Sequence, residues 1–266
     1  MSSNIDRMID LQNVKPGATA VLKLSYNATF DKLHFMLSGG LTKANVGRIE
    51  GKANGVTFFV DDGALLGVRD AYQGLFVDDN VITLDFTEPN TRGGAAAQYL
   101  SALPRNMLAS LTFEIEIKQA AAAASDIKAV AEYRDGTQNP FVLQRKDFNV
   151  PLTLVGENDV MLPVMANGGL IKRIWLHHTG HITVAELRTD GTPRIRAKVG
   201  ELNYQQKRNR LVPQANLLVL DFIGDGNLMN MLDTSRITEA LLRITTDAPD
   251  SLKAYIDYVS DIKLLK

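Results

Sequence analysis

A short apolar run that occurs twice is the strongest constraint on the fold of this chain. The run VITLDF at residues 81–86 recurs as LLVLDF at residues 217–222, 136 positions further along a chain of 266 residues. Runs of this length and composition are typical of buried β-strands. Because the two copies lie at the same place in each half, they predict a duplicated domain.

Further matches follow in the same order along both halves. Residues 35–37 face 174–176 at an offset of 139, and residues 128–133 face 253–258 at an offset of 125. At the offset of 136, Leu66, Leu75 and Asn80 face identical residues, and the pattern Glu50, Lys52, Asn54, Gly55 faces Glu186, Arg188, Asp190, Gly191. Short apolar strings recur by chance, so two unrelated β-rich domains remain the alternative to a duplication.

Most of each half alternates between apolar and polar residues with a period of two, which favours β-strands. Asn54-Gly55 is a strong hairpin-turn signal, and residues 64–73 and 93–103 predict short helices. The pattern predicts an all-β fold of two tandem eight-stranded antiparallel jelly rolls with short connecting helices. The expected divisions are an N-terminal arm at 1–12, a first jelly roll at 13–138 and a second jelly roll at 139–266.

The N-terminal arm places Ile5, Met8 and Ile9 at roughly helical spacing. Such a segment is too short to be a stable helix alone. It has two interpretations: a strap packed on its own domain, or an arm that contacts a neighbouring subunit or a membrane surface through Ile5, Arg7, Met8 and Ile9.

The composition excludes several classes of protein. A net charge of −1 argues against a dedicated nucleic-acid-binding protein. The absence of cysteine excludes disulfides, thiolate metal sites and a cysteine nucleophile. No run approaches the ~18 apolar residues that span a bilayer, and the N-terminus lacks a signal-peptide pattern. We therefore expect synthesis in a cytoplasm and no integral membrane segment.

Histidines and paired aspartates are the candidate metal ligands. His177, His178 and His181 cluster ahead of Glu186, but adjacent strand residues point to opposite faces, so their spacing does not match a cupin metal site. Calcium requires six to eight oxygen ligands. The weak candidates for a structural calcium site are Asp61, Asp62 and Asp225, although no EF-hand spacing is present.

Asp85 and Asp221 occupy the same position in the repeated apolar run. A buried carboxylate requires a cation, solvent or backbone donors, so we expect each aspartate to hold the loop that follows its strand. General acid–base chemistry would require a partner in a cleft, and the sequence contains no candidate partner. No nucleophile elbow, phosphate-binding loop or zinc signature occurs either, so an enzyme is not expected.

Positive charge is concentrated in one part of the second half. The residues are Arg194, Arg196, Lys198, Lys207, Arg208 and Arg210. Residues 201–205 between them suggest a helix. One interpretation is a solvated helical face; the other is contact with an acidic neighbour or with lipid head groups.

Two jelly rolls of this length resemble the double jelly-roll major capsid proteins of tailless icosahedral bacteriophages, of the corticovirus and marine tailless-phage type. The similarity lies in the helix-plus-strand segment 229–246, the ending at 252–259, and the alanine-rich connection 120–124 before residues 126–129. The resemblance covers nearly the whole chain, but it is one of pattern and length.

This resemblance implies a coat protein of the virion capsid shell that is made in the host cytoplasm. It implies a homotrimer forming pseudo-hexameric capsomers, which contact neighbouring capsomers, a penton protein and an internal viral membrane or its proteins. It implies no required cofactor and no sequence-specific nucleic acid. The alternative is a tandem jelly-roll carbohydrate-binding module, which predicts exposed aromatic side chains. The single tryptophan, Trp175, lies in an expected strand, which weakens this alternative. A bicupin enzyme is a third possibility.

Overall fold

The computed structural model describes residues 3–136, 139–162 and 168–265 and divides into two compact units. The first unit comprises Met1–Ala71, Leu75–Lys146 and Val259–Lys266, and the second comprises Tyr72–Gly74 and Asp147–Tyr258. Residues 137–138 lie outside the described residues, so the expected boundary between 138 and 139 stays a prediction. Strands β10 and β18 each contribute residues to both units.

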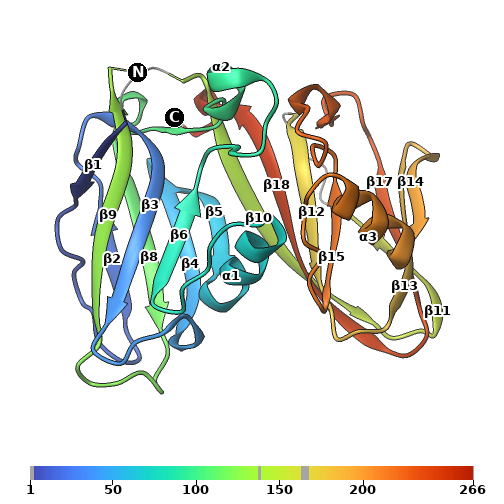
Figure 1. Ribbon diagram of the computed structural model, residues 1–266, viewed down its shortest axis with the longest axis horizontal. Helices are drawn as coiled ribbons and strands as arrows, with labels where there is room; N and C mark the ends of the chain where they lie inside the picture. Colours follow the sequence, from blue (N-terminus) through green and yellow to red (C-terminus); the bar gives the residue numbers. More distant parts are fainter. Residues whose placement is uncertain (1–2, 137–138, 163–167, 266) are drawn as a thin grey trace. The chain divides into compact units, whose positions relative to one another are not determined.

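Two sheets form the first unit, and they are layered face to face (Figure 1). One sheet has the order β1 (Asn4–Arg7), β9 (Asp126–Asp135), β3 (Ala28–Ser38) and β6 (Val81–Asp85), with β7 (Leu103–Pro104) paired to β3. The other has the order β2 (Thr19–Lys23), β8 (Leu111–Ile117), β4 (Val46–Ala53) and β5 (Val56–Asp62), followed by one bridge from β10 (Phe141–Leu152).

The second unit repeats this arrangement. One sheet has the order β10, β18 (Asp250–Asp261), β12 (Leu170–His177) and β15 (Leu217–Asp221), with β16 (Leu232–Asp233) paired to β12. The other has the order β11 (Gly156–Met161), β17 (Ala240–Thr246), β13 (Ile182–Thr189) and β14 (Thr192–Lys198).

Both units have the jelly-roll topology. The eight long strands of each unit, counted along the chain, pair in the order first, eighth, third, sixth in one sheet and second, seventh, fourth, fifth in the other. This is the order of two interleaved Greek keys. The predicted all-β fold of two tandem jelly rolls is therefore confirmed. Each long strand of the first roll has an equivalent strand at the same place in the second.

Strand register corrects one detail of the expected duplication. Lys32 lies opposite Asp85 in the first roll, and Arg173 lies opposite Asp221 in the second. Lys32 is therefore equivalent to Arg173, an offset of 141 in place of the expected 139. A slip of two residues preserves the alternation of apolar and polar side chains, so the sequence pattern could not distinguish the two offsets.

Short helices occupy the connections. The expected helices at 64–73, 93–103 and 201–205 appear as α1 (Gly63–Tyr72), α2 (Gly94–Gln98) and α3 (Val199–Arg208). Single 3₁₀ turns are η1 (Lys43–Asn45), η2 (Arg105–Met107), η3 (Leu228–Asn230) and η4 (Ile262–Leu265). The hairpin turn at Asn54-Gly55 has φ values of 50° and 81°, a conformation that asparagine and glycine tolerate best.

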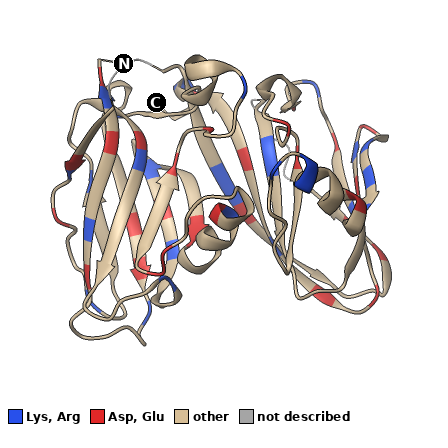
Figure 2. Ribbon diagram, viewed as in Figure 1, with Lys and Arg blue, Asp and Glu red and all other residues tan. Residues whose placement is uncertain are grey.

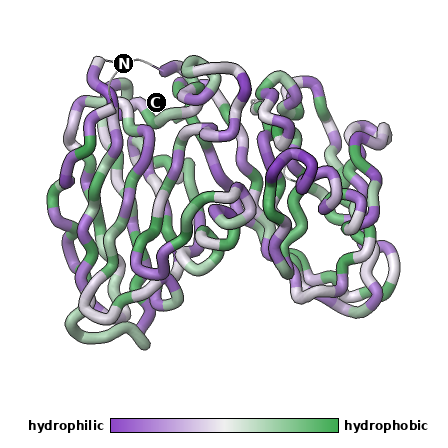
Figure 3. Tube along the Cα trace, viewed as in Figure 1, coloured by the Kyte–Doolittle hydropathy of each residue, from purple (hydrophilic) through white to green (hydrophobic). Residues whose placement is uncertain are grey.

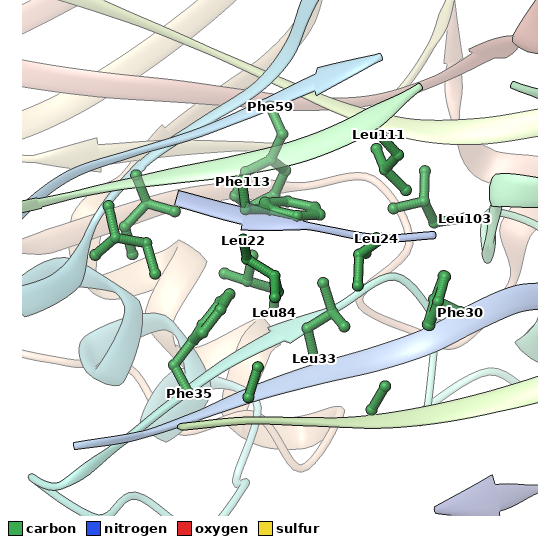
Figure 4. Packing of buried hydrophobic residues seen from close by; sticks show 14 of the residues in the cluster. Leu22, Leu24, Phe30, Leu33, Phe35, Phe59, Leu84, Leu103, Leu111 and Phe113 are labelled. Atoms are coloured by element: carbon green, nitrogen blue, oxygen red, sulfur yellow. The ribbon is translucent and has the colours of Figure 1, made fainter. Parts of the chain in front are cut away.

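The core of the first roll lies between its two sheets. Leu22 and Phe113 of one sheet face Leu33, Phe35 and Leu84 of the other (Figure 4). The strands alternate between hydrophobic and hydrophilic residues (Figure 3), as expected for strands that bury one face only. The second roll has a separate core.

The N-terminal residues form a strand, so the expected helical spacing was wrong. Residues of β1 pair antiparallel with β9, for example Ile5 with Glu132. Met8 and Leu11 pack into the first core. Pairing with a strand more than a hundred residues away therefore outweighs the local preference of a segment too short to form a helix alone.

The C-terminal residues also belong to the first roll. Ile262 and Leu265 of η4 are buried in its core. The Ile262 amide donates to the Pro140 carbonyl at 2.7 Å, and the Asn54 side chain donates to the Leu265 carbonyl at 2.8 Å. The last segment of the chain thus completes the roll that the first segment begins.

Candidate assembly surfaces

The repeated aspartates hold equivalent loops in the two rolls. Asp85 Oδ1 accepts hydrogen bonds from the Thr87 amide at 2.8 Å and its hydroxyl at 2.6 Å. Asp221 Oδ1 accepts from the Ile223 amide at 3.1 Å. In both cases the aspartate binds the amide two residues ahead, which fixes the turn after the strand. Burial raises the pKa of Asp85, against the opposing effect of the Thr87 hydrogen bonds.

The outer face of sheet β10-β18-β12-β15 carries a closed polar cluster around Asp221. Arg173 Nε lies 3.0 Å from Asp221 Oδ2, and Trp175 Nε1 donates to Asp257 Oδ2 at 2.8 Å. The Tyr72 ring packs edge-on against Trp175 at 5.4 Å, and its hydroxyl donates to Asp221 Oδ2 at 3.2 Å. The Arg173 and Asp221 side chains are only 4% and 3% exposed.

The equivalent cluster of the first roll has the same plan but is partly exposed. His34 Nε2 lies 3.1 Å from Glu132 Oε1, and Lys32 Nζ lies 3.3 Å from Glu132 Oε2. The Lys32, His34 and Glu132 side chains are 30%, 23% and 26% exposed. Burial lowers the pKa of Lys32, but Asp85 and Glu132 outweigh it and raise the pKa.

Two arginines surround Asp61, the first candidate calcium ligand. The guanidinium groups of Arg69 and Arg145 both contact the Asp61 carboxylate, and all three side chains are buried. Arg145 also stacks on the Phe59 ring, 4.9 Å from its centroid. Because two cations already occupy this carboxylate, the structure argues against Asp61 as a calcium ligand.

The other two calcium candidates serve as turn residues. Asp62 Oδ1 accepts from the Ala64 amide at 3.1 Å at the start of α1. Asp225 Oδ1 accepts from the Asn227 amide at 3.0 Å, and its Oδ2 accepts from the Asn230 side chain at 3.0 Å. Across the described ranges, no group of three or more histidine or carboxylate side chains is arranged to hold a metal ion.

The structure also separates the histidines. His177 lies on β12 with its ring against Tyr255, whereas His178 and His181 follow in the loop. Burial lowers the pKa of His178, and its Nδ1 lies 3.8 Å from Asp250. Trp175 is fully buried, so it provides no exposed aromatic platform for a carbohydrate.

The N-terminal contact residues fall into two groups. Ile5 and Ile9 are 71% and 68% exposed, and Arg7 is also exposed, with its guanidinium 2.7 Å from Asp10. Met8 is buried in the core and is not available at the surface. No helix among the residues that the structure describes is long and apolar enough to cross a membrane.

The basic residues of the second roll lie on β14 and at the end of α3 (Figure 2). All six are exposed: Arg194, Arg196, Lys198, Lys207, Arg208 and Arg210. Arg196 Nε lies 3.8 Å from Glu186 Oε2, and Arg194 donates to the Thr189 hydroxyl at 2.7 Å. Among the described residues, Arg208 has no ion pair. The Arg208 guanidinium, at the end of α3, is therefore not neutralised by any carboxylate of the described residues.

Comparison with known proteins identifies both halves of the chain. Residues 5–134 match the sequence profile of the viral coat protein P2 N-terminal domain, and residues 142–262 match that of the viral coat protein P2 C-terminal domain. No curated protein sequence gives a significant match.

Solved structures show the same fold over the whole length. The major capsid protein P2 from bacteriophage PM2 has a TM-score of 0.90 at 19% sequence identity, covering 98% of both chains. The major capsid protein of Sulfolobus turreted icosahedral virus has a TM-score of 0.70 at 13% identity, covering 97% of both chains. A capsid chain of virus PBCV-1 has a TM-score of 0.65 at 13% identity, covering 97% of this chain and 95% of its own.

Proposed function

Because the chain belongs to the viral coat protein P2 family, we propose that three copies associate into a capsomer whose six jelly rolls approximate six-fold symmetry. The protein is a structural coat protein of the virion capsid shell, and its assembly surfaces take the place of an active site. Such capsomers would tile an icosahedral shell, with a separate penton protein at the five-fold vertices.

The single observation that supports this proposal is the equivalence of the two rolls, strand for strand. A contact between different surfaces of two copies is heterologous, and it closes into a ring when the rotation between the copies divides a full turn. With two equivalent rolls per chain, a ring of three chains presents six similar lobes. Such a trimer can pack against six neighbours with related contacts.

Mass measurement in solution tests the proposal. We expect the purified protein to show three times the mass of one chain by light scattering coupled to size exclusion, and electron microscopy to show lobed particles. A protein that stays monomeric at every concentration up to its solubility limit would contradict the proposal.

We place a contact with the internal membrane of the virion at the N-terminal segment. Ile5 and Ile9 are exposed apolar side chains beside the exposed cation Arg7. Exposed apolar side chains favour a membrane interface, whereas Arg7 is paired with Asp10 and gives the segment no excess of positive charge. Each side chain contributes little alone, so binding requires many copies on one surface.

Flotation with zwitterionic phosphatidylcholine vesicles tests this contact. Assembled protein should float with the vesicles, and the double variant Ile5→Ser with Ile9→Ser should float several-fold less. The control is Met229→Ser, which removes an even more exposed apolar side chain from the second roll. Equal flotation of wild type, the double variant and the control would remove the N-terminal segment from the proposal.

A further inference from the structure

Helices α1 and α3 are equivalent elements of the two rolls. They start at Gly63 and Val199 and end at Tyr72 and Arg208, so both ends keep the offset of 136. Each links the fifth strand of its roll to the sixth. Tyr72 therefore occupies in the first helix the position that Arg208 occupies in the second.

The two helix ends also have the same backbone geometry. In each, the residue two positions after the helix has a left-handed conformation, and the next amide donates back across the last turn. The values are φ 74° at Gly74 with Leu75 donating to Asp70 at 3.0 Å, and φ 65° at Arg210 with Leu211 donating to Gln206 at 3.0 Å. Because this C-cap fixes the last turn, the Tyr72 and Arg208 side chains leave their helices in equivalent directions.

Tyr72 shows which contacts a side chain at this position makes when it covers a polar cluster. Its ring packs on Trp175 and its hydroxyl donates to Asp221. Its carbonyl accepts a hydrogen bond from the Val212 amide at 2.8 Å. These contacts lie within the second unit. The cluster beneath Tyr72 is closed to solvent, because Arg173 is only 4% exposed and Trp175 is fully buried.

The first roll has the same cluster without such a cover. By strand register, Lys32, His34 and Asp85 are equivalent to Arg173, Trp175 and Asp221. Glu132 supplies the second carboxylate, and it bonds His34 as Asp257 bonds Trp175. About a quarter of each of the Lys32, His34 and Glu132 side chains is exposed. The cluster is therefore open to solvent.

The charges of this open cluster complement Arg208. Two carboxylates, Asp85 and Glu132, and one ammonium, Lys32, leave an excess of one negative charge. Arg208 is exposed and has no ion pair among the residues that the structure describes. A guanidinium group binds carboxylates through several donors in fixed geometry, so it suits this cluster better than a second tyrosine would.

Phe76 follows helix α1 as Val212 follows helix α3. It is equivalent to Val212, whose amide binds the Tyr72 carbonyl. The Phe76 side chain is 90% exposed, which is unusual for a large apolar residue outside an interface. The equivalent contact between two copies would join the Phe76 amide to the Arg208 carbonyl, as the Val212 amide joins the Tyr72 carbonyl.

We propose that the end of α3 of one copy binds the open cluster of a second copy, with Arg208 over His34 and Glu132 and Phe76 against the helix end. This contact rests on the proposed trimer and assigns residues to it. It joins the second roll of one copy to the first roll of the next, so it is heterologous, and in the proposed trimer the ring closes after three such contacts.

Charge reversal at the helix end tests the electrostatic part. Arg208→Glu should weaken the trimer by about tenfold or more, because it brings a carboxylate to an acidic cluster. The matched control is Lys207→Glu, which makes the same change of charge at the neighbouring exposed position and should alter the trimer less than about threefold. Equal effects of the two variants would overturn the proposal.

Disulfide trapping tests the geometry. Because the chain has no native cysteine, only the introduced cysteines can form the crosslink. A backbone hydrogen bond from residue 76 to residue 208 brings their Cα atoms within reach of a disulfide. Under oxidising conditions, Phe76→Cys combined with Arg208→Cys should give a three-chain species that reduction dissolves. Phe76→Cys with Lys207→Cys should give several-fold less of it.

The mass of the wild type separates two kinds of failure. A wild-type protein that is trimeric, with a double-cysteine variant that stays trimeric in mass but uncrosslinked, would overturn this contact and leave the proposed function standing. A wild-type protein that never exceeds one chain would overturn both.

Discussion

Removing the charge of Asp61 tests how the first roll tolerates buried ions. The Asp61 carboxylate is the shared partner of Arg69 and Arg145, and all three side chains are buried. Asp61→Asn keeps the shape of the side chain and removes its charge. Two guanidinium groups then remain in the interior beside a neutral amide.

The expected cost is large because of what is left behind. Breaking a buried ion pair by removing one partner costs about 3–5 kcal/mol, since the other charge stays desolvated. The total stability of a domain is only about 5–15 kcal/mol. For a unit of this size, each kcal/mol lowers the melting temperature by roughly 2–4 °C. We therefore expect melting to fall by roughly 6–20 °C.

Circular dichroism during thermal unfolding measures this change, and Asp62→Asn is the control. Asp62 is the next residue and accepts the Ala64 amide at the start of α1, a role that asparagine fills equally well. The control should melt within about 2 °C of wild type. Equal melting temperatures for Asp61→Asn and Asp62→Asn would refute the argument that the buried arginines depend on Asp61.

Three further substitutions have defined outcomes. Burial raises the pKa of Asp70 to about 6 from 3.8. Its charged form therefore destabilises the folded protein above that pH. Asp70→Asn should raise the free energy of unfolding by about 1–3 kcal/mol at pH 7.5. That gain should vanish in melting curves as the pH falls from 6 towards 3.8, and a gain independent of pH would contradict it. Ile262→Ala should cost about 2–5 kcal/mol in chemical denaturation because Ile262 is fully buried; a cost below 1 kcal/mol would mean that η4 is dispensable. Tyr72→Phe removes one hydrogen bond to the Asp221 carboxylate and should cost about 1–2 kcal/mol when unfolding is followed by Trp175 fluorescence, whereas unchanged unfolding would exclude a contribution from that bond.

The sequence contained most of the fold because jelly-roll strands carry local signals. Alternation, the turn at Asn54-Gly55 and the repeated run at 81–86 predicted strands, hairpin and duplication. Strand β1 was missed because its partner, β9, lies more than a hundred residues away. Residues 35–37 were aligned two residues out of register. Side chains of a strand alternate with a period of two, so a shift of two residues leaves the apolar and polar pattern unchanged.

The interaction clusters were less accessible to sequence analysis. The strand aspartates stood out because both copies keep them within an apolar run. In contrast, the partners of Asp61 lie 8 and 84 residues away, and no local pattern links them. The cluster at Lys32, His34 and Glu132 combines two strands, so only the register of β3 with β9 brings it together. A correct offset of 141 would have aligned His34 with Trp175.

The return of η4 to the first roll determines when that roll can be finished. A ribosome makes the chain from its N-terminus, and domains usually fold in that order. Here Ile262 and Leu265 enter the core of the first roll, but they emerge only after the whole second roll has been synthesised. At ordinary elongation rates this is a delay of roughly ten seconds. The nascent first roll therefore stays incomplete until residues 262–265 have been made, and every chain that enters assembly with a closed first core also contains the whole second roll.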